Sequence, residues 1–113
     1  MSIFSSLIKP SLAVSMLRNN LSKQLNKKII FFSLVYTAST NILEFICDGQ
    51  RYKFDDNNIK KLITGTAKNQ LKKNQTLDVL VANIDDKNNC DAKLYYTEIV
   101  KGIPQKTFVT YKF

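Results

Sequence analysis

The fold of this chain is decided by residues 28–54, KIIFFSLVYTASTNILEFICDGQRYKF. Apolar side chains occupy both alternating sets of positions in the first third of this stretch, which is typical of a central strand buried on both faces. Asp48-Gly49 predicts a two-residue hairpin turn, because both turn positions must accept a positive φ. We therefore expect three consecutive strands, over residues 28–37, 42–47 and 51–54.

A second helix and three more strands are predicted to follow. Asp55 and Asp56 carry short acidic side chains of the kind that caps the start of a helix. Apolar residues then recur at helical spacing, at Ile59, Leu62, Ile63, Ala67 and Leu71. We expect this helix to reach about Lys73, with Asn74 as a left-handed terminator. Strands are expected over residues 77–84, 92–100 and 106–113, with residues 102–104 as the last connection.

The N-terminal part of the chain has no acidic residue before Glu44. Apolar residues at mostly helical spacing predict a helix over residues 11–26, preceded by a short helical turn: Ile3, Leu7, Val14, Leu17, Leu21 and Leu25. Four interpretations stay open, namely packing on the protein's own sheet, a mitochondrial targeting segment, a membrane-surface helix, and an arm that docks into a larger assembly. We divide the chain into an N-terminal amphipathic helical segment, residues 1–26, and an α+β domain, residues 27–113.

The predicted order is helix, three strands, helix, three strands. This order favours the α+β class, with a mostly antiparallel sheet and the helices on one face. A crossover from the third to the fourth strand would bring in one parallel pair. The length of 113 residues suits one modest core, and no convincing sequence repeat relates the two halves.

Most catalytic and metal-binding chemistry has no residues to support it. The sequence contains no histidine, so the usual general base and most zinc sites are missing. It also lacks the glycine-rich motifs that bind nucleotide phosphates. The run from Asp85 to Asp91 superficially resembles a calcium loop, but it lacks the central glycine and the closing glutamate. We expect no enzyme, no cofactor and no metal, with Cys47 and Cys90 as two free thiols of an intracellular protein.

The positive charge points to a polyanion as partner. Seventeen Lys and Arg against nine Asp and Glu give a net charge of +8, and fifteen of the seventeen are lysine. Lysine contacts phosphate as a point charge, so contact with the nucleic-acid backbone is expected rather than base recognition. Two sites are predicted, a basic ridge on the second helix and the terminal hairpin: Lys61, Lys68, Lys72 and Lys73, and Lys93, Tyr95, Phe108 and Lys112. The competing interpretations are a solvated helix face and ordinary cross-strand packing.

The leading hypothesis is a non-enzymatic binding protein that engages nucleic acid without sequence preference. The alternative is a structural or interaction subunit of a virion, an organellar complex or an inhibitor complex, which uses the N-terminal helix or the C-terminal edge strand. An acidic protein partner and a homo-oligomer are both compatible with this alternative. The short, lysine-rich chain is similar in composition to phage or mobile-element accessory proteins. The sequence contains no run of 18 apolar residues, so we expect no transmembrane helix. We expect a cytoplasmic location, with the virion or the mitochondrion as alternatives.

Overall fold

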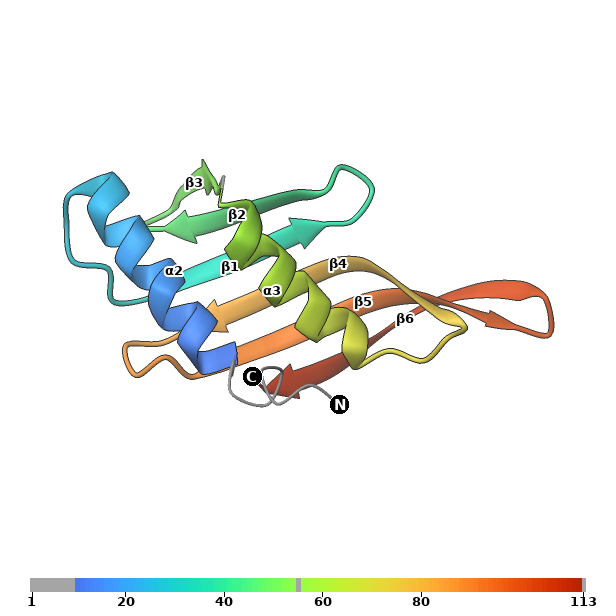
Figure 1. The fold of residues 1–113 in the computed structure, drawn as a ribbon. Coiled ribbons are helices and arrows are strands. Elements are labelled where there is room, and N and C mark those ends of the chain that lie inside the picture. Colours follow the sequence, from blue (N-terminus) through green and yellow to red (C-terminus); the bar gives the residue numbers. More distant parts are fainter. Residues whose placement is uncertain (1–9, 55, 113) are drawn as a thin grey trace.

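The computed structural model describes residues 10–54 and 56–112, which form two helices and six strands (Figure 1). In chain order these elements are α2 (Pro10–Leu25), β1 (Phe32–Thr37), β2 (Ile42–Cys47), β3 (Gln50–Lys53), α3 (Asn57–Asn69), β4 (Gln75–Ile84), β5 (Cys90–Val100) and β6 (Ile103–Lys112). The short turn predicted before Pro10, together with Ile3 and Leu7, lies outside the described residues.

All six strands form one sheet, in the order β3-β2-β1-β4-β5-β6. Every neighbouring pair in this sheet is antiparallel. Both helices lie side by side on the same face (Figure 1). The predicted α+β class is therefore confirmed. The parallel pair does not form among the described strands, because β4 pairs with β1 and not with β3.

The two halves of the chain are related by an internal pseudo-two-fold arrangement. Each half contributes a helix and three strands, and the halves meet where β1 pairs with β4, with Val35 opposite Val81. The same offset in residue number separates Leu17 from Ile63 and Leu21 from Ala67, which are buried residues of α2 and α3. It also separates Leu25 from Leu71, which are both partly buried against the core. The sequence analysis found no repeat because the halves share a burial pattern rather than residue identities.

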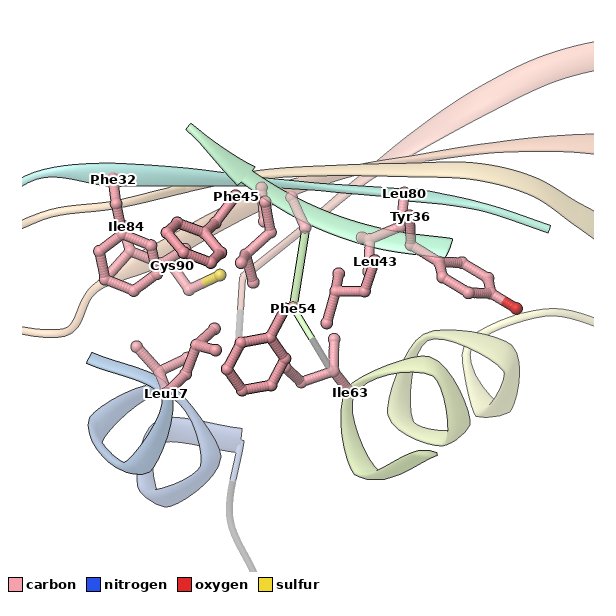
Figure 2. Packing of buried hydrophobic residues seen from close by; sticks show 14 of the residues in the cluster. Leu17, Phe32, Tyr36, Leu43, Phe45, Phe54, Ile63, Leu80, Ile84 and Cys90 are labelled. Carbon is pink, nitrogen blue, oxygen red and sulfur yellow. The ribbon is translucent and has the colours of Figure 1, made fainter. Parts of the chain in front are cut away.

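The core lies between the helices and the covered face of the sheet. Figure 2 shows Leu17 of α2 and Ile63 of α3 on the helical side and Phe45 and Leu80 on the sheet side, with Phe54 between the two layers. Val14, Leu17 and Leu21 are at most 3% exposed. Of the four interpretations of the N-terminal stripe, packing on the protein's own sheet therefore holds for this part of α2.

The predicted end of the second helix is wrong, while its start is confirmed at Asp56. The Asp56 side chain accepts hydrogen bonds from the backbone N–H of Asn58 and Ile59, so it is the N-cap. Asp55 lies outside the described residues. The helix ends at Asn69, and Gln70 caps it with a right-handed φ of −83°. Asn74 has no positive φ, and the predicted ridge residues Lys72 and Lys73 lie in the loop after α3.

β1 is central as predicted, but it begins at Phe32 and is not buried on both faces. Ile30 and Phe31 are 47% and 64% exposed. The Arg18 guanidinium donates hydrogen bonds to the carbonyl oxygens of Ile29 and Ile30, and these bonds hold the segment outside the sheet. The last connection is also shorter than expected: it is a two-residue turn at Lys101 and Gly102. β6 therefore starts at Ile103 and includes Pro104.

Candidate binding surfaces

The two predicted sets of binding residues do not form one site. Lys61 and Lys68 belong to α3, in the layer that covers the sheet. Lys93 and Tyr95 alternate along β5 with Ala92 and Leu94, which are buried under the helices. Because successive side chains of a strand point to opposite faces, Lys93 and Tyr95 lie on the uncovered face. The two predicted sites therefore lie on different faces of the molecule.

The first surface, which we call the α3 ridge, consists of Lys61, Lys68, Lys72 and Lys73. Ile59, Ile63 and Ala67 face the core, which turns Lys61 and Lys68 toward solvent on the outer side of α3. All four lysines are exposed, and none forms an ion pair with a described residue. No acidic residue occurs from residue 57 to residue 77. The ridge therefore carries positive charge with no side-chain anion on the same segment.

Two lysines outside the ridge, Lys60 and Lys27, have partners. The Lys60 ammonium donates a hydrogen bond to the carbonyl oxygen of Asn41 at 3.1 Å, which ties α3 to the β1–β2 turn. Lys27 forms an ion pair with Asp48. This hydrogen-bonded pairing raises the pKa of Lys27 and lowers the pKa of Asp48. Such lysines hold the fold together locally, whereas the ridge lysines have no comparable role.

The second surface, the uncovered hairpin face, brings together Lys93, Tyr95, Phe108 and Lys112 as predicted. The register places Tyr95 opposite Phe108, with ring centroids 5.6 Å apart and planes tilted by 41°. The Lys93 ammonium lies 5.2 Å from the centroid of the Phe108 ring, a cation–π geometry. Two hollows of about 440 and 500 Å³ meet at Tyr95. This face therefore presents aromatic side chains beside two open hollows.

The charge of the uncovered hairpin face is more balanced than that of the α3 ridge. The Lys112 ammonium is 3.8 Å from the Asp91 carboxylate, and both residues line the hollow of about 440 Å³. Asp78 lines the neighbouring hollow and accepts a hydrogen bond from the Thr97 hydroxyl at 2.6 Å. Anions thus intermingle with cations on this face, so the α3 ridge has the stronger unbalanced positive charge.

The sequence analysis missed the exposed apolar surface of the last two strands. Of the nine large hydrophobic side chains exposed in the described part of the chain, six belong to β5 and β6: Tyr95, Ile99, Val100, Ile103, Phe108 and Val109. The hairpin projects past the end of α3 (Figure 1), so no helix covers its far end. The hydrophobicity of these strands is nearly equal on both faces, so no signal in the sequence indicates that their far ends are exposed.

The cysteines and the acidic loop have structural roles. Cys47 and Cys90 are free thiols, as predicted, and both are buried. Burial raises the pKa of Cys90 to about 12 and also raises that of Cys47, which opposes formation of the nucleophilic thiolate. The Asp85 carboxylate accepts hydrogen bonds from the N–H of Lys87 and Asn89 at 2.9 Å each. Residues 10–54 and 56–112 contain no cluster of three or more Cys, Asp or Glu suited to a metal ion.

Comparisons with other proteins add no assignment to this geometry. No protein-family model matches the chain, and no curated protein or solved structure is significantly similar to it. Neither of the helices in the described part of the chain is long and apolar enough to cross a membrane. The functional argument therefore depends on the two surfaces described above.

Proposed function

We propose that this is a non-enzymatic binding protein whose α3 ridge contacts the backbone of nucleic acid without sequence preference. The observation that carries the proposal is the concentration of four lysines on a segment with no acidic residue, where none of them forms an ion pair with a described residue: Lys61, Lys68, Lys72 and Lys73. Lysines that neutralise phosphates release condensed counterions, and this release drives non-specific binding.

The chemistry of the ridge favours backbone contact over base recognition. All four ridge residues are lysines, whose compact ammonium groups lack the planar fork with which arginine recognises guanine. The only arginine of the helices described, Arg18, is occupied by backbone carbonyls. Non-specific affinities of this kind have dissociation constants of roughly 10⁻⁴ to 10⁻⁶ M at physiological salt.

The test is a fluorescence anisotropy titration of labelled single- and double-stranded DNA and RNA over a series of salt concentrations. The wild-type protein is compared with a variant in which Lys61, Lys68, Lys72 and Lys73 are replaced by alanine. A matched control replaces four exposed lysines elsewhere, Lys53, Lys87, Lys101 and Lys106, so both variants lose the same charge. Each lysine in contact with a phosphate contributes about 0.9 to the salt slope for duplex DNA and about 0.7 for single strands.

We expect the ridge variant to bind more weakly and with a shallower salt slope than the control variant. Equal loss in both variants would show that net charge alone attracts the polyanion, and it would overturn the ridge as the site. Absence of binding by the wild-type protein at low salt would overturn the proposed function.

A second candidate function is that of an interaction subunit that binds another protein through the β5–β6 hairpin. The observation that favours it is the gathering of six of the nine exposed large hydrophobic side chains on these two strands. Apolar surface concentrated in one region marks interaction sites more often than scattered apolar residues do. Light scattering of the full chain and of an Ile103→Ser/Val109→Ser variant tests whether this surface joins copies of the chain.

A further inference from the structure

β6 has ten residues but contributes nothing to the buried core. Among the described residues, Leu94 is the last buried hydrophobic residue, and no residue from Tyr95 to Lys112 is buried. β6 is also the edge of the sheet, with β5 on one side and no described strand on the other. Core packing therefore does not account for the length of this strand.

The phase of the β5–β6 ladder determines which backbone groups of β6 face outward. Val100 and Ile103 flank a two-residue turn, so they form a hydrogen-bonded pair, and such pairs alternate along an antiparallel ladder. The residues of the intervening pairs direct their backbone polar groups away from β5: Pro104, Lys106, Phe108, Thr110 and Lys112. Proline has no N–H, and its presence in this set is what an edge strand permits.

The outward-facing residues of β6 that follow Pro104 have a distinct charge pattern. Lys106 and Lys112 flank Phe108 and Thr110, and all four side chains lie on the uncovered face. Lys106 forms no ion pair with a described residue, and Lys112 shares Asp91 at 3.8 Å. A strand added here would place its own side chains beside two ammonium groups with an exposed aromatic ring between them.

We propose that β6, through the outward-facing backbone groups between Lys106 and Lys112, binds an extended acidic segment of a partner protein as a seventh strand of the sheet. The inference rests on the second candidate function and names the chemistry of the partner. Backbone hydrogen bonds to an edge strand supply affinity, and neighbouring side chains supply specificity. The fitting segment carries acidic side chains beside Lys106 and Lys112 and an apolar side chain beside Phe108.

The same lysines exclude other strands. Lysine on an edge strand normally prevents pairing between sheets, and a second copy of this chain would bring its own net charge of +8 to the edge. An acidic segment removes this repulsion, since each carboxylate lies next to an ammonium group. The edge is therefore selective by repelling the wrong strand as well as by attracting the right one.

The test uses a labelled synthetic peptide with glutamates six residues apart and valines between them, titrated with the full-length protein. We expect saturable binding that weakens with salt. Charge reversal in a Lys106→Glu/Lys112→Glu variant is expected to weaken binding by about tenfold or more, since like charges on neighbouring strands repel. This variant is expected to bind instead a peptide in which lysines replace the glutamates. A Lys87→Glu/Lys101→Glu variant, with the same change in net charge but off the edge, is the control.

A backbone test separates strand addition from simple ion pairing. Thr110→Pro removes an N–H that faces outward and leaves the ladder to β5 intact, whereas Thr110→Val keeps this N–H. We expect the proline variant not to bind the peptide and the valine variant to bind it as the wild-type protein does. Circular dichroism is used to show that both variants are folded. Equal binding by both variants would overturn strand addition.

The remaining outcomes are distinguishable from one another. Equal binding of the acidic and the basic peptide would overturn the proposal of an acidic partner. The same proposal would be overturned if light scattering showed that the wild-type protein forms a dimer and the Lys106→Glu/Lys112→Glu variant does not. A dimer of this kind would still support the hairpin as an interaction surface. No peptide binding together with no self-association would overturn both the inference and the second candidate function. The variant in which the four ridge lysines are replaced by alanine is expected to bind the peptide normally. The nucleic-acid proposal is therefore tested independently of this one.

Discussion

The β2–β3 and β5–β6 hairpins occupy equivalent places in the two halves of the molecule but differ in length. Both turn on two residues with positive φ, Asp48-Gly49 at 52° and 75° and Lys101-Gly102 at 52° and 77°. The first hairpin has strands of 6 and 4 residues, and the second has strands of 11 and 10. The fold needs only the shorter form, so the additional length of β5 and β6 is available for contacts outside the molecule.

The largest expected effect compares one phenylalanine from each hairpin. Phe45 of β2 is fully buried and stacks on Tyr52 with ring centroids 5.0 Å apart, whereas Phe108 of β6 is 52% exposed. We expect Phe45→Ala to lower the free energy of unfolding by about 4 kcal/mol through lost burial and a cavity. Phe108→Ala is expected to lower it by less than about 1 kcal/mol. Denaturant unfolding of both variants measures the difference, and equal losses would show that β6 belongs to the core.

A smaller effect is expected at Arg18, which ties the helix of the first half to the β4–β5 turn of the second. Its guanidinium donates hydrogen bonds to the carbonyl oxygens of Ile29 and Asp85 and to the side chain of Asn88, and it lies 5.1 Å from the Phe32 ring centroid. Arg18→Ala is expected to lower the free energy of unfolding by about 2 kcal/mol.

Arg18→Lys is expected to restore little of this stability, because an ammonium group cannot reproduce the planar fork of donors. Lys23→Ala, an exposed change on the same helix, is the control and is expected to be nearly neutral. Full recovery with lysine in urea unfolding would mean that charge, rather than geometry, joins the halves at this point.

The smallest effect at neutral pH concerns the thiol of the second half. Burial raises the pKa of Cys90 to about 12 from its ordinary value of 9.0. The folded protein therefore holds the thiol proton at pH values where the unfolded chain has lost it, so stability is complete below pH 9 and declines as the pH rises toward 12. Cys90→Ala should flatten this part of the stability profile. A profile unchanged by the substitution would contradict the protected thiol.

Local signals predicted most of the first half correctly. Asp48-Gly49 placed the first hairpin, and the bounds of β2 agree with the prediction because the turn fixes its end. The cap at Asp56 placed the start of α3 for the same kind of reason. The register that brings Lys93, Tyr95 and Phe108 to one face also follows from the alternation of strand residues. In each case the deciding interaction lies within a few residues.

The errors arose where distant residues decide the structure. Ile30 and Phe31 have the composition of a strand, but Arg18 holds this segment out of the sheet. Lys101 gives no local sign that it adopts a positive φ, so the second turn was placed too late. The sequence also did not indicate which face of the β5–β6 hairpin is uncovered, because this depends on the side of the sheet on which both helices pack.

The pairing of β1 with β4 has a consequence for how the chain folds. Every other ladder of the sheet joins strands that are consecutive in the chain, so each can form as a local meander. The β1–β4 ladder closes a long loop, from Thr37 to Val79, and its formation must bear the entropy of that closure. Because folding slows as contacts span more of the chain, we expect formation of this ladder to limit the folding rate.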